Sequence, residues 1–187
     1  MTRSRLVPTP TPGGQPSAGD VDHYPGPLVA TKSTIGWREW VRLPELGGVL
    51  VKAKVDTGAR TSSLHAYDLA ERERDGETWI DFSFHPLQRD TATVASGSAR
   101  LVDRRRVTAS NGQSEIRPVV ETEIELDERR LPIELTLTRR DEMGFRMLLG
   151  RRAMREDFLI DPRRSYRGAE SKAQRRRERA ARKAAAS

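Results

Sequence analysis

The 187-residue sequence contains no cysteine, and this absence excludes disulfide bonds and cysteine-based zinc sites. It also contains no apolar run close to the roughly 20 residues that a membrane-spanning helix needs. Residues 1–10 lack the apolar segment that is typical of a secretory signal. Together these absences lead us to expect a soluble, cytoplasmic protein with no membrane partner.

Apolar residues are scarce for a globular chain, since 35% of the residues are hydrophobic and 33% are charged. Residues 1–32 hold six of the eleven prolines and few large apolar side chains, which predicts a disordered leader. Residues 168–187 are rich in Arg and Ala, which predicts a basic, solvated and transiently helical tail. We therefore expect one folded domain, residues 33–167, between two disordered extensions.

The net charge of +7 is not spread evenly along the chain. Residues 163–187 contain ten Lys or Arg and two Glu, a net charge of +8, so residues 1–162 carry −1. The basicity therefore belongs to the tail and says little about the folded part. Two interpretations of the tail stay open: contact with RNA or a ribosome through phosphates, or solubility alone.

The expected domain consists largely of short segments with the alternation of β-strands. In residues 49–55, for example, three apolar side chains alternate with Lys52 and Lys54. Further strands are expected at residues 35–41, 78–84, 100–107, 116–126 and 131–137. Only residues 64–74 and 151–157 are expected to be helical. Many short strands separated by turns indicate an all-β fold, either a closed β-barrel or a sandwich.

The strand at residues 49–55 leads into Asp56-Thr57-Gly58-Ala59, the segment with the clearest chemical potential. Backbone hydrogen bonds can hold an Asp rigidly at a strand end, and the Thr57 hydroxyl can tie the loop to a second copy. Gly58 permits a close turn because it has no Cβ, and the small Ala59 leaves room for a substrate. Asp-Thr-Gly also suits an ordinary turn, so its surroundings must distinguish the two interpretations.

Asp56 alone cannot support aspartic-peptidase chemistry, which needs two carboxyl groups that share a proton. One acts as base towards water, and the other acts as acid towards the substrate carbonyl. Like charges about 3 Å apart cannot both ionise, so such a pair titrates with two separated macroscopic pKa values. Because the sequence contains a single Asp-Thr-Gly, the second Asp56 must come from another copy, which predicts a homodimer.

About 90 residues after this loop comes Leu148-Leu149-Gly150-Arg151, an apolar pair followed by Gly and an expected short helix. The two segments together resemble the retropepsin pattern, in which the second segment packs beneath the catalytic loop. Several longer blocks resemble more closely a bacterial family that is named as ATP-dependent zinc proteases and linked to the RimK glutamate ligase. These blocks are IGWREW (35–40), KAKVDTGARTS (52–62), HPLQR (85–89) and ELTLTRRD (134–141).

The resemblance covers residues 35–167 and implies a retropepsin-like closed β-barrel, the acid-protease fold, with a short C-terminal helix. It implies that Asp56, Thr57 and Gly58 are catalytic. Some members of the family are described as trimming glutamates that the ligase adds to a small-subunit ribosomal protein. The resemblance therefore implies an aspartic peptidase that acts on glutamyl or acidic peptides, with a ribosomal protein as a candidate substrate.

The family's name implies zinc and ATP, but the sequence offers few residues for either. Catalytic zinc usually needs three protein ligands, and the histidines are His23 in the leader, His65 and His85. A zinc peptidase with His65, His85 and a carboxylate remains one alternative, and a non-catalytic module that binds ribosomes or RNA remains another. There is no Gly-x-x-x-x-Gly-Lys loop for ATP phosphates. We predict a mechanism without metal or other cofactor.

The candidates for substrate binding are Ala59, Arg60, Thr61, His65 and Arg151. Viral retropepsins place an acidic residue where this chain has Arg60, and a guanidinium can bind a carboxylate bidentately. Arg60 is therefore expected to bind an acidic substrate, the alternative being a structural ion pair. Arg151 is expected either to hold the dimer edge or to bind substrate. His65 is expected either to line a pocket or to form local hydrogen bonds.

Two further features concern the surroundings of the site. Residues 105–117 are expected to form a hairpin with Ser110-Asn111-Gly112-Gln113 at its tip, because Asn-Gly favours tight turns. This hairpin is the candidate for the flap with which retropepsins cover a substrate and exclude water. Lys54 lies on the same strand face as Asp56, so it is expected either near the dyad, whose pKa it would lower, or on the outer surface.

Overall fold

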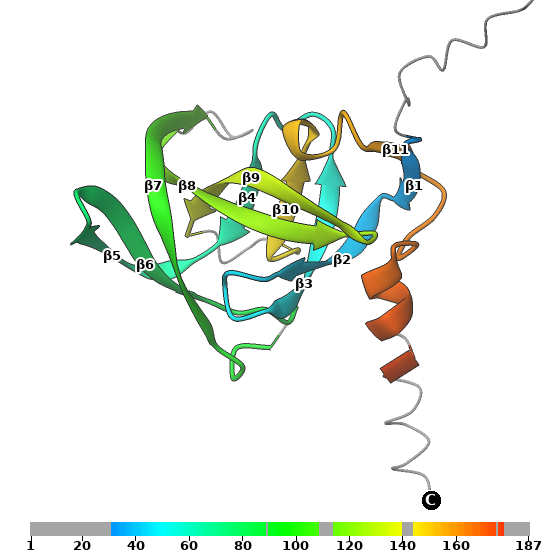
Figure 1. Ribbon diagram of the computed structural model, residues 1–187, viewed down its shortest axis with the longest axis horizontal. Helices are drawn as coiled ribbons and strands as arrows, with labels where there is room; N and C mark the ends of the chain where they lie inside the picture. Colours follow the sequence, from blue (N-terminus) through cyan, green and yellow to red (C-terminus); the bar gives the residue numbers. More distant parts are fainter. Residues whose placement is uncertain (1–30, 89, 109–113, 140–143, 175, 178–187) are drawn as a thin grey trace, which may run out of the picture. The chain divides into compact units, whose positions relative to one another are not determined.

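The computed structural model describes residues 31–88, 90–108, 114–139, 144–174 and 176–177 (Figure 1). Strands dominate this part of the chain, which confirms the all-β prediction. The leader, apart from its last two residues, and residues 178–187 of the tail lie outside the described residues. None of the described helical segments has the length and apolar character that a bilayer crossing requires.

Six strands form a closed barrel, as expected from the sequence. In order around the barrel they are β2 (Arg38–Leu43), β3 (Val49–Asp56), β10 (Met147–Gly150), β4 (Ser62–His65), β9 (Arg129–Thr138) and β8 (Ser114–Leu126). The barrel closes where Arg42 of β2 pairs with Glu125 of β8. Closure gives the six strands neighbours on both sides, and so removes free edges.

Three more strands extend the sheet from β8 and lie outside the closed barrel. They are β7 (Ala95–Thr108), β6 (Glu77–Phe84) and β5 (Tyr67–Arg74), and β5 forms the outer edge. Every residue of β5 from 68 to 74 is exposed, and most of them are charged. Charged side chains on an edge strand oppose pairing with other chains.

The predicted helix at residues 64–74 is wrong, because this segment forms β4 and β5. Its second half, Leu69 to Arg74, consists of residues that favour helices in isolation. In the structure, β5 instead pairs antiparallel with β6 from Ala70 to Arg74. Pairing with a neighbouring strand therefore outweighs local propensity here. Of the second predicted helix, residues 151–157, only the start is helical: a short 3-10 helix, η1 (Arg151–Ala153), is followed by a turn at residues 154–157.

The core is filled by the inward faces of the barrel strands together with apolar side chains of β6 and β7, such as Phe84 and Ala99. Val51, Ala53 and Val55 of β3 are at most 8% exposed and lie in this core, as their alternation predicts. Burial of apolar surface at roughly 25 cal/mol per Å² is the main force that holds the strands together. The chain thus reaches Asp56, the last residue of β3, on a rigid, well-packed strand.

The residues after the barrel pack against its outside. Strand β11 (Phe158–Asp161) pairs in parallel with β1 (Ser33–Gly36). The segment after β11 contacts Glu39 of β2, which is fully buried. Glu39 accepts hydrogen bonds from the backbone N–H groups of residues 36, 167 and 168. Ser171, also fully buried, donates its hydroxyl to Glu39 at 2.7 Å. The start of the tail, helical at residues 169–174, is therefore anchored to the barrel through polar contacts that its composition did not predict.

Candidate active site

Asp56 is held at the end of β3 by the turn that follows it. Its Oδ1 accepts hydrogen bonds from the backbone N–H groups of Gly58 at 3.1 Å and Ala59 at 3.2 Å. The side chain is half-buried, whereas Thr57 and Gly58 are exposed. Oδ2 accepts no hydrogen bond from any residue that the structure describes. The backbone thus fixes one carboxylate oxygen, and the other has no hydrogen-bond donor among the described residues.

The second motif lies directly beside this loop. Gly150, the last residue of β10, is the parallel neighbour of Asp56. A Cβ at Gly150 would lie 2.4 Å from the carbonyl carbon of Thr61, so only glycine allows this close approach. The backbone N–H of Gly150 also donates to the Ser62 hydroxyl at 3.2 Å. The structure thus brings together the two segments whose combination in the sequence resembles retropepsins.

Arg151 holds the loop from outside. Its Nη1 donates to the carbonyl of Gly58 at 2.9 Å and lies 3.5 Å from that of Thr57. Its backbone N–H donates to the carbonyl of Ala59 at 2.9 Å. These contacts tie Arg151 to the loop of its own chain, and its predicted dimer-edge and substrate-binding roles stay predictions.

Arg60 is exposed at the end of the loop. Its carbonyl accepts a hydrogen bond from the backbone N–H of Arg152 at 3.2 Å, which fixes the backbone there. Its guanidinium forms no ion pair with any of the described residues. The structural ion pair that was the alternative for Arg60 is thus not found among them, and the cation faces solvent near Asp56.

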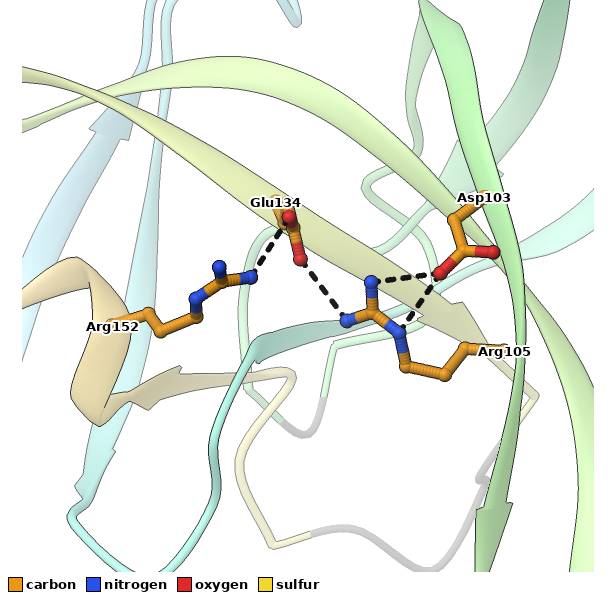
Figure 2. A network of polar contacts seen from close by, with 4 residues as sticks. All are labelled: Asp103, Arg105, Glu134 and Arg152. Atoms are coloured by element: carbon orange, nitrogen blue, oxygen red, sulfur yellow. Dashed lines mark hydrogen bonds and ion pairs between the residues drawn. The ribbon is translucent and has the colours of Figure 1, made fainter.

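A chain of ion pairs connects the neighbourhood of Arg60 to β7 (Figure 2). Nη1 of Arg152, in η1, donates to Glu134 Oε1 at 2.9 Å. The other oxygen of Glu134, on β9, accepts from Nη1 of Arg105 at 3.0 Å. Arg105 in turn contacts Asp103 Oδ2 through Nε at 3.0 Å and Nη2 at 2.8 Å. We call these four residues the Arg105–Glu134 network.

Charge complementarity shifts the pKa values within this network. Partial burial of Glu134 opposes ionisation, but the hydrogen bonds and positive charges of Arg105 and Arg152 outweigh it and lower the pKa of Glu134. The hydrogen bond to Glu134 raises the pKa of Arg105 despite partial burial, with Asp103 adding to the effect. Sequence reasoning missed the network. Its one signal was that Glu134 begins a block that resembles the zinc-protease family.

A hollow of about 240 Å³ lies beside the network, between it and the residues that follow the Asp56 loop. Its lining includes Thr61 and Ser62 from the loop side, and Glu134 and Arg152 from the network. Thr61, a predicted substrate-binding residue, therefore lies at a concave surface next to the loop. Its role in binding stays a prediction.

The two histidines of the domain lie on either side of Tyr67. The His65 side chain is 2% exposed, and its ring centroid lies 6.4 Å from that of Tyr67. The Tyr67 ring lies 5.0 Å from that of His85, whose Nδ1 is 3.1 Å from the carbonyl of Thr93. Within the described ranges, no three His, Asp or Glu side chains are grouped as metal ligands. Burial of His65 gives it a packing role, and its predicted pocket role stays a prediction.

The predicted hairpin is present. Strands β7 and β8 pair antiparallel up to Thr108 and Ser114, and the predicted tip, residues 110–113, lies outside the described residues. In Figure 1, the ends of β7 and β8 next to this tip and the loop after β3 all lie towards the upper side of the barrel. The hairpin and the loop after β3 are thus at the same end of the barrel.

Comparison with known proteins places this site in a family. Residues 34–170 match the RimB-like family, described as retropepsin-like aspartic endopeptidase RimB. The chain is also 48% identical over 131 residues to a probable alpha-L-glutamate ligase of Desulfotalea psychrophila, and 46% identical over 135 residues to one of Shewanella pealeana. These matches cover 70% and 72% of this chain but 28% and 30% of the relatives. The chain therefore spans less than a third of the length of these curated relatives.

One solved structure is similar over almost its whole length. It is the crystal structure of a Legionella pneumophila protein of unknown function, and the two chains are 27% identical with a TM-score of 0.63. The similarity covers 73% of this chain and 98% of that chain. The barrel described above is thus similar to a fold observed experimentally.

Proposed function

This chain belongs to the RimB-like family of retropepsin-like proteins, and on that basis we propose that it is an aspartic peptidase that works as a homodimer. The observation that carries the proposal is the geometry of Asp56. Two backbone N–H groups hold one oxygen of its carboxylate, and Gly150 packs directly beside it. A rigid carboxylate with one free oxygen, at the exposed end of a strand, suits a shared-proton dyad.

In the proposed mechanism, the two Asp56 carboxyl groups of a dimer hold one proton between them. The ionised group removes a proton from water as its oxygen attacks the carbonyl carbon of the scissile bond. The protonated group gives its proton to the carbonyl oxygen, which yields a neutral tetrahedral intermediate. As this intermediate collapses and the C–N bond breaks, one of its hydroxyl groups gives a proton to the ionised Asp56. The leaving nitrogen takes up the proton of the other Asp56, so the dyad again holds one proton.

The proposed substrate is a peptide with glutamate or other acidic residues, with a ribosomal protein as the candidate carrier. Support comes from Arg60, an exposed cation close to the dyad that forms no ion pair with a described residue. A guanidinium can form two parallel hydrogen bonds with one carboxylate. The curated relatives are named glutamate ligases, which associates sequences of this kind with glutamate.

The hairpin of β7 and β8 is proposed to be the flap that covers the bound substrate. Exclusion of water would strengthen the electrostatic interactions of the dyad. The Arg105–Glu134 network supports this role, because it ties β7 to η1 and, through the backbone of Arg152, to the catalytic loop.

The proposal is tested with Asp56→Asn in the full-length chain. This variant is expected to lose hydrolysis of a glutamate-containing peptide, followed by mass spectrometry, while analytical ultracentrifugation shows an unchanged dimer. Asp75→Asn is the matched control, since Asp75 is exposed and its positive φ of 52° is tolerated by Asn. The control should keep full activity. Wild-type rates in Asp56→Asn would rule out the aspartic mechanism.

A further inference from the structure

The face of β3 that carries Asp56 also carries two lysines. Side chains two residues apart on a strand point to the same face, so Lys54 and Lys52 lie on the face of Asp56, opposite the buried core positions. Lys54 is exposed and forms no ion pair or hydrogen bond with a described residue. A free cation therefore stands two strand positions from the proposed catalytic carboxylate, on the surface rather than buried beside it.

The neighbouring strands add positive charge and no negative charge to this face. Arg38 of β2 is the antiparallel partner of Lys54, and Leu148 of β10 is its parallel neighbour. Among the residues that β2, β3 and β10 direct to this face, Asp56 is the only carboxylate. An approaching anion thus meets uncompensated positive charge beside Asp56.

Aromatic rings hold Arg38 in position. Its guanidinium carbon lies 4.5 Å from the ring centroid of Trp37 and 5.0 Å from that of Tyr166. Cation–π contacts of this kind orient a cation without neutralising it. Arg38 forms no ion pair with a described residue, and its Nε is buried without a hydrogen-bond acceptor. No described residue therefore neutralises the positive charge of Arg38, which adds to the charge of Lys54 on this face.

The second lysine is held in the same way. Lys52 Nζ lies 4.9 Å from the ring centroid of Trp40, its antiparallel partner, and 6.0 Å from that of Tyr166. Trp40 is only 5% exposed and lies outside the main cluster of core side chains. Two cations on this face, Arg38 and Lys52, therefore lie against aromatic rings. Lys54 is the cation nearest to Asp56 along the strand.

We propose that Lys54, supported by Arg38, forms a subsite that binds an acidic side chain of the substrate beside the scissile bond. Two strand positions span about 6.6 Å, which is also the spacing of alternate side chains in an extended peptide. A carboxylate two residues from the scissile bond therefore matches the spacing of Lys54 from Asp56. Arg60 lies on the other side of Asp56 in the chain, so Lys54 and Arg60 bind different acidic residues of one peptide.

This inference rests on the proposed function and goes beyond it, because it assigns substrate selection to a second cation. With Arg60 alone, the enzyme would require one acidic residue near the scissile bond. With Lys54 as well, a peptide with acidic residues on both sides is preferred over one with a single acidic residue. Uncompensated positive charge on this face also disfavours basic peptides.

Binding is measured separately from hydrolysis. Full-length Asp56→Asn protein is titrated with fluorescein-labelled hexaglutamate, and the dissociation constant is read from fluorescence anisotropy. Adding Lys54→Gln is expected to weaken binding about fivefold, the upper range for one exposed ion pair. Lys54→Arg should retain the affinity, since it keeps the charge. The matched control is Arg72→Gln, which removes an equal charge from the exposed strand β5 outside the barrel.

Each outcome has a definite meaning. A fivefold loss in Lys54→Gln, restored in Lys54→Arg and absent in Arg72→Gln, supports the subsite. Unchanged hexaglutamate binding in Lys54→Gln overturns it, as does a loss confined to labelled oligouridine, which would make this face a nucleic-acid site. If hexaglutamate binding depends on Lys54 but wild-type protein does not hydrolyse glutamyl peptides, the subsite stands and the proposed peptidase function fails.

Discussion

Arg152 joins Glu134 to the loop that follows Asp56. Its Nη1 lies 2.9 Å from Glu134 Oε1, while its backbone N–H lies 3.2 Å from the carbonyl oxygen of Arg60. A single residue of η1 therefore contacts both the ion-pair network and the backbone of the predicted substrate-binding arginine. Movements of β7 can reach the loop through this residue, and this coupling can be tested.

Glu134→Gln removes the charge that Arg105 and Arg152 share. Because these groups are about one-third exposed, we expect a loss of at most about 1 kcal/mol in the free energy of unfolding, measured in urea. We expect a several-fold fall in kcat, since the hairpin loses its link to η1. The control Glu71→Gln breaks an ion pair with Arg104 away from the loop and should keep kcat. Equal kcat in both variants would argue against coupling.

The lowered pKa of Glu134 predicts how this contribution depends on pH. The usual pKa of a Glu is 4.5, and the arginines lower it in the folded state. The stabilisation is therefore fully present above about pH 4.5 and is lost as the pH falls through the folded-state pKa below it. The difference in unfolding free energy between wild type and Glu134→Gln should show this profile. A difference that grows as the pH falls would contradict it.

Gly150→Ala tests the close packing of the two motifs. Its new Cβ would lie 2.4 Å from the Thr61 carbonyl carbon, which is backbone and cannot move aside without displacing the loop. We expect a destabilisation of about 1–3 kcal/mol, typical of overpacking, together with a large loss of activity. Gly144→Ala is the control, because a Cβ there meets nothing within 4 Å. A fully stable and active Gly150→Ala would show that the packing is looser than described.

Arg151→Ala tests the hold on the loop. It removes the hydrogen bonds from Nη1 to the carbonyls of Gly58 and Thr57 but leaves the backbone N–H to Ala59 intact. The loop should become more mobile, so kcat should fall about tenfold while KM changes little, if Arg151 positions Asp56 and does not bind substrate. A rise in KM alone would instead indicate substrate binding. Arg155→Ala, which removes an exposed arginine paired with Glu156, serves as control.

The sequence predicted the parts of the fold that depend on local pattern. The alternation of residues 49–55 correctly predicted β3 and its buried face. The retropepsin pattern correctly paired the segment of Asp56 with that of Gly150, which are neighbours in the sheet. The helix predicted at residues 64–74 failed, because β5 takes its structure from its partner β6. Because these residues favour a helix and are exposed to solvent, their sequence does not indicate that they pair with β6.

Contacts between side chains far apart in the sequence could not be predicted. The Arg105–Glu134 network joins three elements that only the barrel brings together, and no residue spacing marks it. Burial of Glu39 under the start of the tail is similar, since its donors come from residues 36, 167, 168 and 171. A buried carboxylate needs such donors, but a sequence does not show that this Glu is buried.

The central claim is that two Asp56 carboxyl groups from two copies of the chain form one catalytic site. The most direct test is a crystal structure of the full-length protein with a non-cleavable glutamyl peptide. We expect a symmetric dimer in which the two Asp56 carboxyl groups approach to about 3 Å at the peptide's scissile position. A peptide bound to a single chain, or two Asp56 carboxyl groups too far apart to share a proton, would contradict it.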